Sequence, residues 1–274
     1  MTVFPFRAAS HTALNRKLYA LLLLFAFLFG FGIAVKLHLH RAPEPPPVIP
    51  PPYQYSKMTA SNGVVLHAIQ TSPDNISLKA ITTNVTQTGE FGINGGFFYN
   101  GDLLSIAVTG DVPAKGQQGD YGSGWYNTDR RKGTLVWDEV TRRFSVQIAE
   151  SSDELQVADR NRYWAQGGVS MSLTREQLWR DQALAEDMPA FDEKRLRSAV
   201  VYDSGQHVWL IASETKATVE EFREAVKMNV ARGTLVDGVF LDGDGSTQLK
   251  CEEAELKGDT RAVYQMMALT KTHS

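Results

Sequence analysis

Short β-prone runs separated by Gly, Asn, Asp and Pro constrain the fold of this chain more than any other feature. Residues 64–69, 77–81, 236–241 and 262–269 are such runs. Short apolar runs between turn-forming residues are typical of strands. Long helical segments between them are too few for a doubly wound parallel sheet. The sequence therefore predicts a single α+β domain with mixed or antiparallel sheets and a few helices.

Two hairpins and two helices can be placed within this domain. Residues 134–137 and 144–148 flank a polar turn, and residues 198–202 and 207–212 flank Asp203-Ser204-Gly205-Gln206. Turn-forming residues between β-prone runs predict hairpins. Thr218 and Glu221 form a capping-box pattern ahead of an apolar periodicity, which predicts a helix. Thr174 with Gln177 predicts the start of a second helix that runs towards Ala185.

The N-terminal part of the chain predicts one transmembrane helix. Residues 18–35 carry no charge, and about 18 apolar residues are close to the shortest helix that crosses a bilayer. A secretory signal core is usually shorter, about 7–15 residues, and ends at a small-residue cleavage site. Here the run ends in Lys36-Leu37-His38 without a clear cleavage site. We interpret it as an uncleaved anchor, with a cleaved signal as the alternative.

Charges and prolines around this run suggest how the chain is divided. Basic residues are slightly more numerous before the run than after it, which favours a cytoplasmic N-terminus and an exported C-terminal domain. The Pro-rich stretch 42–52 favours a stiff polyproline II spacer, although a disordered leader is the simpler alternative. We therefore expect a cytoplasmic segment 1–17, an anchor 18–35, a Pro-rich linker 36–57 and a folded domain 58–274.

Charge and cysteine content exclude several classes of protein. From residue 53 onwards the chain has 23 basic and 30 acidic residues, a formal charge of −7. An acidic domain of this kind does not have the basic excess of a nucleic-acid surface, so no nucleic-acid partner is expected. Cys251 is the only cysteine, which excludes an internal disulfide and zinc sites built on paired cysteines.

Two polar, glycine-containing segments follow strand-like runs and suggest two walls of one pocket. The first is Asn94-Gly95-Gly96-Phe97, and the second is Asp242-Gly243-Asp244-Gly245-Ser246. Glycines let backbone amides approach a ligand, and successive amides form a concavity for anions. The carboxylate of Asp242 could serve as a general acid, a general base or a cation ligand. The simpler interpretation is that both segments are only turns.

Two further segments are candidates for the same pocket. Arg197 precedes a β-prone run, and its guanidinium group could bind phosphate in a bidentate manner, or it could be a solvated strand-end charge. Gly167 and Gly168 follow another strand-like run and could form a third loop of the pocket or only a bulge. His67 and His207 have no metal-ligand spacing and are interpreted as strand residues.

The spacing of Asp242, Asp244, Ser246 and Glu253 partly copies an EF-hand loop. Thr247 stands where the sharp turn of such a loop requires Gly, and Lys250 occupies a ligand position. No cofactor is therefore predicted. A divalent cation such as calcium is left open but is not supported.

Taken in order, these motifs resemble the phosphodiester glycosidase family. The segment 92–98 is similar to the family's Asn-[Ala/Gly]-Gly-Phe-Phe block, and the segment 241–247 is similar to its Leu-Asp-Gly-Gly-Gly-Ser block. The segments 165–168 and 197–200 are similar to its Gly-Gly and Arg-Thr-Ala blocks. The resemblance covers the chain from about residue 64 to residue 269. Asp244 departs from the family pattern, because it adds a negative charge where a glycine is usual.

The resemblance implies a hydrolase that releases a sugar from a phosphodiester-linked partner. Asp242, Arg197 and Asn94 would be its catalytic residues. The substrate would be held by glycine and polar residues of the same segments, namely Gly95, Gly96, Phe97, Gly167, Gly168, Gly243, Asp244, Gly245 and Ser246. We expect a single-pass protein of the bacterial inner membrane whose extracytoplasmic domain acts on envelope or exopolysaccharide glycans. The alternatives are a non-catalytic polysaccharide-binding or assembly protein of the same fold, and a structural envelope protein.

Overall fold

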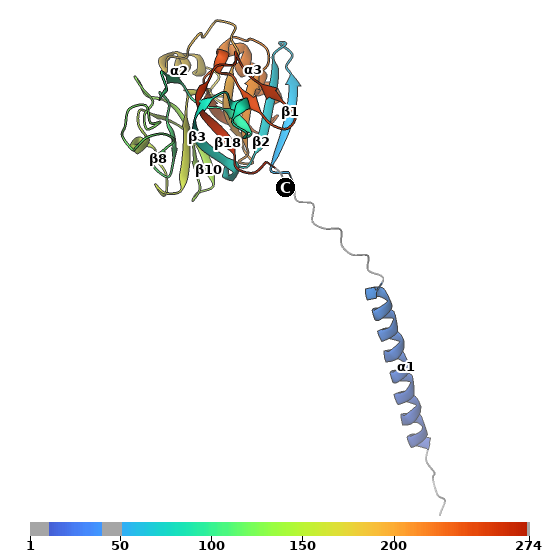
Figure 1. Ribbon diagram of the computed structural model, residues 1–274. Coiled ribbons are helices and arrows are strands. Elements are labelled where there is room, and N and C mark those ends of the chain that lie inside the picture. The colour runs from blue at the N-terminus through green and yellow to red at the C-terminus, as the bar shows by residue number, and fades with distance from the viewer. Residues whose placement is uncertain (1–10, 40–50, 273–274) are drawn as a thin grey trace, which may run out of the picture. The chain divides into compact units, whose positions relative to one another are not determined.

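The computed structural model of the protein describes residues 11–39 and 51–272 (Figure 1). The chain divides into an N-terminal unit up to residue 49 and a C-terminal unit from residue 50. The N-terminal unit contains α1 (His11–Leu39), which exposes large apolar side chains such as Leu23 and Phe25. Within the described ranges, no helix meets the combined length and hydropathy required of a membrane span. Residues 1–10 of the expected cytoplasmic segment and residues 40–50 of the expected linker lie outside the described residues.

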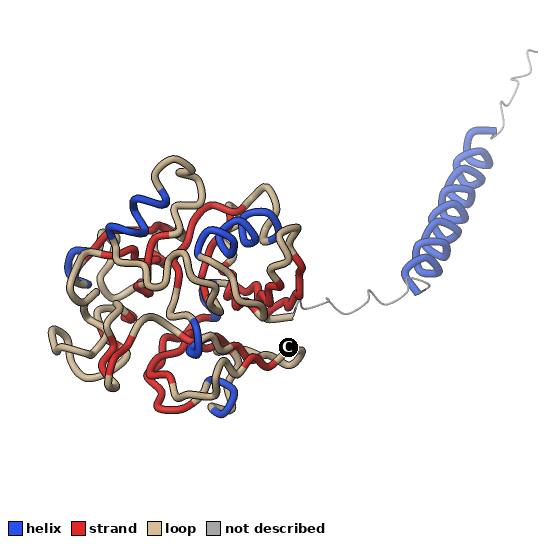
Figure 2. The backbone as a smooth tube through the Cα atoms, turned by 90° about the horizontal axis from the view of Figure 1, so that it is seen from above, coloured by secondary structure: helices blue, strands red, loops and turns tan. Residues whose placement is uncertain are grey.

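The C-terminal unit is built from antiparallel sheets. Its described residues form one six-stranded sheet, two five-stranded sheets, named here the β9 sheet and the β18 sheet, and one two-stranded ribbon. The six-stranded sheet has the order β1 (Tyr53–Thr59), β2 (Val65–Thr71), β14 (Val208–Ser213), β13 (Ser198–Asp203), β15 (Leu235–Phe240) and β12 (Val169–Ser170). Seen from above, the strands lie in several separate groups rather than in one continuous sheet (Figure 2).

The other sheets complete the unit. The β9 sheet has the order β10 (Arg143–Ala149), β9 (Lys132–Asp138), β11 (Tyr163–Gly167), β7 (Ala107–Thr109) and β8 (Val112–Pro113). The β18 sheet has the order β17 (Glu255–Leu256), β16 (Leu249–Lys250), β4 (Gly92–Asn94), β18 (Val263–Leu269) and β3 (Ile76–Thr83). The ribbon pairs β5 (Phe98–Tyr99) with β6 (Asp102–Leu103). Together with the helices described below, these sheets confirm the predicted α+β class.

Both predicted hairpins are present. β9 pairs with β10 from Asp138 opposite Arg143, and β13 pairs with β14 from Tyr202 opposite Val208. Short 3-10 helices lie in connections between strands, at Pro73–Asn75, Val85–Gln87, Ser152–Glu154 and Asp244–Ser246.

The six-stranded sheet is buried on both faces, and β13 shows this most clearly. Ala199 and Val201 belong to an apolar cluster that includes helix residues, whereas Val200 and Tyr202 belong to a second cluster that includes Trp137 of β9. Successive side chains of a strand point to opposite faces of the sheet. Burial of every β13 residue follows from this arrangement and explains why its apolar run shows no polar alternation.

Two short helices lie at the same end of this unit, at the top of the view in Figure 1. The predicted capping box opens α3 (Val219–Asn229): the Thr218 side chain accepts from the Glu221 amide, and the Glu221 carboxylate accepts from the Thr218 amide. Its apolar side packs Phe222, Ala225 and Val226 into the cluster against the six-stranded sheet. The helix ends at Asn229 with Val230 in an extended conformation.

The start predicted for the second helix is wrong. α2 (Trp179–Ala185) begins after Leu178, and Thr174 does not cap it. Residues 173–178 form turns instead, with the Leu178 amide bonded to the Arg175 carbonyl. Glu176 is directed to the buried Arg223, whose Nη1 donates to the Glu176 carboxylate over 3.2 Å.

The folded unit begins earlier than the expected boundary at residue 58. Tyr53–Thr59 forms β1, which pairs with β2 along its whole length from Tyr53 opposite Thr71 to Thr59 opposite Val65. The Tyr53 side chain is buried, and its hydroxyl donates to Glu253 over 3.0 Å. The end of the segment expected as a linker is therefore an edge strand of the six-stranded sheet.

Candidate active site

Three segments that are remote in sequence meet at the ends of β4, β13 and β15. Nδ2 of Asn94 donates to the backbone carbonyl of Asp242 over 2.8 Å, and the Asp242 amide donates to the Gly95 carbonyl over 3.1 Å. The hydroxyl of Ser198, the residue after Arg197, donates to Oδ1 of Asn94 over 2.9 Å. The structure thus brings together three of the segments that were predicted to form one pocket.

Asn94 is a structural link and does not present its amide to a ligand. Its side chain is 1% exposed. Nδ2 donates to the carbonyls of Gly95 and Asp242, while Oδ1 accepts from the Ser198 hydroxyl and from the Gln248 amide. A side-chain amide has two N–H donors and two acceptor sites. All four are occupied, so Asn94 positions Asp242 and has no free group for a substrate.

Gly95 and Gly96 serve close packing between chain segments. A Cβ on Gly95 would lie 1.4 Å from Oε1 of Gln265, and one on Gly96 would lie 2.4 Å from Cβ of Ser105. Their amides donate to the carbonyl and to the side-chain oxygen of Gln265, respectively. Because these amides are already bonded, they do not form the anion concavity that the sequence suggested.

Gly167 and Gly168 lie outside the pocket and are not a third loop of it. A Cβ on Gly167 would meet Oδ1 of Asn127 at 2.3 Å, and one on Gly168 would meet the Phe240 carbonyl at 2.1 Å. Both glycines therefore permit sheets to pack closely. The neighbouring Gln166 connects this region to the site, since its Oε1 accepts from Nε2 of Gln265 over 2.9 Å.

A pocket of about 230 Å³ lies beside Asp242. Both acidic residues of the second predicted segment, Asp242 and Asp244, line it together with Arg195 and Arg197. Its remaining walls are apolar or backbone, and are formed by Phe97, Met188, Pro189, Ala190, Leu241 and Gly243. Few polar groups converging in an apolar concavity are typical of ligand sites.

Asp242 is the group in this pocket best suited to proton transfer. Burial raises the pKa of its carboxyl to about 6, although hydrogen bonds from Ser246 and the Gly243 amide oppose this rise. A carboxyl that titrates near neutral pH can both hold and release a proton under working conditions. Ser246, which was predicted to bind substrate, is 2% exposed and acts on Asp242 instead.

Arg197 is a buried, fixed cation. Its guanidinium group donates to four backbone carbonyls, those of Pro189, Ala190, Glu193 and Ala217, at 2.5–3.2 Å. Four of its five N–H groups are therefore used, and one Nη1 hydrogen remains. Burial lowers the pKa of Arg197 to about 10, so the group stays charged at neutral pH. It holds one wall of the pocket and contributes positive charge there, without the free bidentate edge that the sequence suggested.

Asp244 lines the pocket, and its charge is compensated by Arg195. Nη1 of Arg195 donates to Oδ2 of Asp244 over 3.1 Å, and the Asp244 backbone has a φ of 53°. Gly245 next to it is enclosed by Asp259 and Arg261, since a Cβ there would lie 2.2 Å from Oδ2 of Asp259. Gly243 allows the Leu196 carbonyl to approach closely, because a Cβ on residue 243 would lie 2.8 Å from that carbonyl oxygen.

Arg195, Gln248 and Gln265 contribute to the site but were not predicted from the sequence. Arg195 could have been found, because it lies two residues before Arg197 in an extended segment that bridges to Ala217, and alternate residues of such a segment share a side. Gln248 and Gln265 gave no such signal. In the described part of the chain there is no group of three or more His, Cys, Asp or Glu side chains placed to hold a metal ion.

The fold and this pocket define an α+β domain with two carboxyl groups and two guanidinium groups in one cavity. Comparison with protein-family models gives no match, and a search of curated proteins gives none either. Among solved structures, the chain is similar to the catalytic domain of zebrafish N-acetylglucosamine-1-phosphodiester alpha-N-acetylglucosaminidase, auto-inhibited by its pro-peptide. The TM-score is 0.57 at 15% identity, over 82% of this chain and 84% of that one. This likeness supports a common fold.

A second structure, of a hypothetical protein from Synechocystis, gives a TM-score of 0.44 at 13% identity over 79% of this chain and 61% of that one.

Proposed function

We propose that the protein is a membrane-anchored, extracytoplasmic hydrolase of sugar-1-phosphodiester bonds in envelope or exopolysaccharide glycans. The observation that carries this proposal is the Asp242 carboxyl, with a pKa of about 6, in a pocket that also contains the guanidinium groups of Arg195 and Arg197. An anionic phosphodiester requires positive charge for binding, and cleavage of its glycosidic bond is assisted by a proton donor.

Each charged residue of the pocket has a role in this proposal. Asp242 is the general acid that protonates the leaving oxygen as water replaces it at the sugar carbon, because a carboxyl with a pKa raised to about 6 retains its proton at higher pH than an ordinary carboxyl does. Arg197 provides fixed positive charge, and the more exposed Arg195 contacts the phosphate. Asp244 is not assigned as a second catalytic carboxylate, because Arg195 neutralises it. The similar fold of the catalytic domain of an N-acetylglucosamine-1-phosphodiester alpha-N-acetylglucosaminidase supports the proposal of a hydrolase, but not the roles of single residues.

The membrane location is part of the same proposal and is supported by the sequence. The uncharged run 18–35 lies within α1, whose described apolar side chains are exposed. Exposed apolar side chains along a helix favour burial in lipid or in a partner. In this proposal α1 anchors the protein to the bacterial inner membrane, with the C-terminal unit in the extracytoplasmic space.

One observation favours a second candidate function, a non-catalytic domain that binds polysaccharide. The Asp244 carboxylate lines the pocket, where it disfavours a phosphate group. Hydroxyl groups of a neutral sugar could instead donate to this carboxylate and accept from Arg195. In that case Asp242 would bind a hydroxyl group and would not transfer a proton.

A hydrolysis assay distinguishes the two candidates. The full chain in detergent is incubated with a chromogenic sugar-1-phosphodiester, beside the Asp242→Asn and Arg197→Ala variants. The enzyme proposal predicts turnover by the parent and loss of turnover in Asp242→Asn by at least about 100-fold. If the parent and Asp242→Asn release chromophore at the same background rate, the enzyme proposal is rejected and the binding function is favoured.

A further inference from the structure

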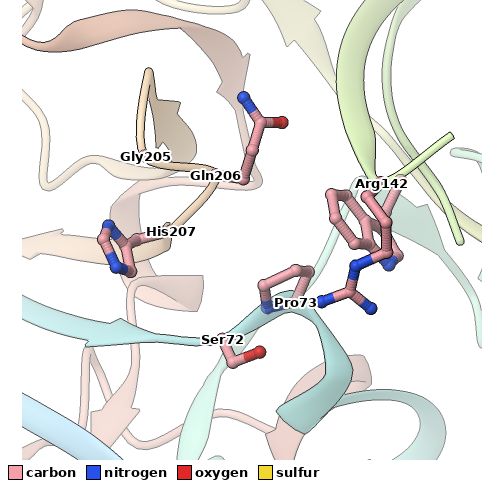
Figure 3. A pocket seen from close by; sticks show the side chains of 7 residues that line it. Ser72, Pro73, Arg142, Gly205, Gln206 and His207 are labelled. Carbon is pink, nitrogen blue, oxygen red and sulfur yellow. The ribbon is translucent and has the colours of Figure 1, made fainter.

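A second pocket, of about 300 Å³, lies where three turns of the C-terminal unit meet (Figure 3). It is lined by Ser72 and Pro73 at the start of a 3-10 helix, by Trp137 and Arg142 of the β9–β10 hairpin, and by Gly205, Gln206 and His207 of the β13–β14 turn. No residue is common to this pocket and the Asp242 pocket. Its volume is sufficient for one small ring of a ligand.

Trp137 supplies an unusual feature of this pocket, a buried donor without an acceptor. The side chain is 1% exposed, and its Nε1 has no hydrogen-bond partner. Buried N–H groups nearly always have a partner in folded proteins, and an exception calls for an explanation. The guanidinium carbon of Arg142 lies 5.0 Å from the centre of the indole ring and covers it.

Arg142 is an exposed side chain that retains unused donors. Nη1 donates to both carboxylate oxygens of Asp74 at 2.8–3.0 Å, while Nη2 and Nε have no hydrogen-bond partner among the described residues. In Figure 3, Arg142 lies on the opposite side of the pocket from Gln206 and His207, with its guanidinium group beside Pro73. Oε1 of Gln206 accepts from the Phe144 amide, so its Nε2 hydrogens are available. Unused hydrogen-bond donors therefore outnumber unused acceptors among the side chains of this pocket. Such a pocket favours a ligand that is rich in acceptor oxygens.

An adjoining pocket extends this site across the β13–β14 turn. It has a volume of about 390 Å³ and shares Gly205 and His207 with the first. Arg232 and the partly exposed indole of Trp209 line it. Arg232 makes no ion pair with any described carboxylate, and its Nη2 donates only to Asn229. Each pocket therefore has one guanidinium group and one indole, on the two sides of a shared turn. The adjoining pocket is also lined by Asp203, whose buried carboxylate already accepts from the His207 amide and from Nε1 of Trp209.

We propose that these two pockets bind an acidic glycan, with a uronic acid carboxylate at Arg142 and the next unit of the chain beside Arg232. In this proposal Nε1 of Trp137, which has no partner within the fold, donates to an acceptor oxygen of the same unit. A repeating, linear polyanion matches two adjoining pockets with one cation each. This inference does not depend on the hydrolase proposal.

An acidic glycan fits this site better than an acidic peptide does. Extended peptides are commonly bound through free main-chain groups of a strand or turn. Here the amides of Ser204, Gln206 and His207 are all bonded within the fold. The Gly205 amide is not bonded within the described part of the chain, but a single amide cannot form the ladder of bonds that holds an extended peptide. The other accessible groups are side-chain donors and the indole of Trp209, and these suit a ligand with ring oxygens and carboxylates.

Titration calorimetry of the full chain in detergent tests this proposal, with trigalacturonate as the probe and its neutral methyl ester as the control. We expect saturable binding of the acid and binding of the ester weaker by about tenfold or more, because charged hydrogen bonds are lost. Arg142→Gln should weaken binding of the acid by about tenfold. Trp137→Phe, which keeps an aromatic ring and removes Nε1, should weaken it as well.

Two further variants make the result specific to this site. Asp74→Asn removes the competing carboxylate and leaves Arg142 in place, so it should bind the acid at least as tightly as the parent does. Asp242→Asn should bind it unchanged, since Asp242 lies in the other pocket. The proposal is overturned by equal binding of acid and ester, by absence of binding, by unchanged affinity in Arg142→Gln, or by tighter binding of an Asp/Glu-rich peptide.

Discussion

Nδ2 of Asn94 donates to the backbone carbonyl of Asp242 over 2.8 Å, between two residues that are 148 positions apart in the chain. The bond joins the end of β4 to the segment after β15 and is buried with the rest of the Asn94 side chain. The placement of the Asp242 carboxyl in its pocket therefore depends on a residue that itself presents nothing to the pocket. Asn94 is a positioning residue in this account.

We expect Asn94→Asp to unfold the protein more easily. The substitution replaces Nδ2 by an oxygen that faces the carbonyls of Gly95 and Asp242, so two hydrogen bonds are lost and like charges approach. The expected cost in the free energy of unfolding is about 3 kcal/mol, measured by denaturant titration. The same substitution at the exposed Asn100 should change it by less than about 0.5 kcal/mol. Equal effects of the two substitutions would contradict the role given to Asn94.

The raised pKa of Asp242 predicts a pH dependence of stability. Between its ordinary value of 3.8 and the folded value of about 6, the folded state binds the proton more tightly than the unfolded state does. Its contribution to stability is thus present below this window and is lost as the pH rises through about 6. Relative to Asp242→Asn, the parent should lose about 2 kcal/mol of unfolding free energy between pH 4 and pH 8, a value discounted for partial exposure.

Chemical denaturation of the parent and of Asp242→Asn at several pH values measures this difference, because the contributions of other carboxyls largely cancel. A difference that stays constant from pH 4 to pH 8 would show that the Asp242 carboxyl has an ordinary pKa.

Gly95→Ala should destabilise the fold severely. The new Cβ would lie 1.4 Å from Oε1 of Gln265, which accepts from the Gly96 amide, so the buried contact between Gln265 and Gln166 must break. We expect a loss of about 3 kcal/mol or more, measured as unfolding free energy. Gly63→Ala is the control, because its Cβ meets open space and only the left-handed backbone is strained, at about 1 kcal/mol.

Arg195→Gln should weaken substrate binding without changing the stability of the fold. Arg195 lines the pocket and is 40% exposed, whereas Arg197 is buried and bonded to backbone carbonyls. We expect Arg195→Gln to leave the thermal midpoint unchanged and to raise KM for a phosphodiester substrate by about tenfold. Arg197→Lys should lower the thermal midpoint, since an ammonium group cannot bond to four carbonyls. An unchanged KM in Arg195→Gln would exclude Arg195 from phosphate binding.

Membrane attachment is tested by fractionation of cells that produce the full chain. The protein should stay in the membrane pellet after alkaline carbonate washing, because the proposed anchor is held by apolar contacts and not by surface charge. Replacement of Leu22, Leu24 and Phe27 by Lys should release it to the supernatant. Release of the unmodified chain by carbonate would contradict an integral anchor.

The sequence predicted several of the strands and the meeting of three segments, although it assigned most of β1 to a linker. Apolar runs between turn residues located β2, β13 and β15, and the capping box located α3. Asn94 and Asp242 could be placed near each other because each follows a strand and precedes glycines. The Thr174–Gln177 pattern failed, because Glu176 forms an ion pair with Arg223 of another helix and no local rule includes that contact.

The roles of the polar residues could not be predicted in the same way. A sequence shows that Asn94 and Arg197 are polar but not that every amide position of Asn94, or four N–H groups of Arg197, are used inside the fold. The glycines were predicted to let a ligand approach the backbone. In the structure, Gly95 packs against the Gln265 side chain and Gly168 packs against the Phe240 carbonyl. Both outcomes depend on partners that are remote in sequence.

The pH dependence of kcat/KM for a chromogenic sugar-1-phosphodiester tests the central claim most directly. We expect kcat/KM to fall as the pH rises through about 6, the value at which Asp242 loses its proton, and Asp242→Asn to be inactive at every pH. Cleavage by Asp242→Asn at the parent rate, or a parent profile without a transition near this pH, would contradict it.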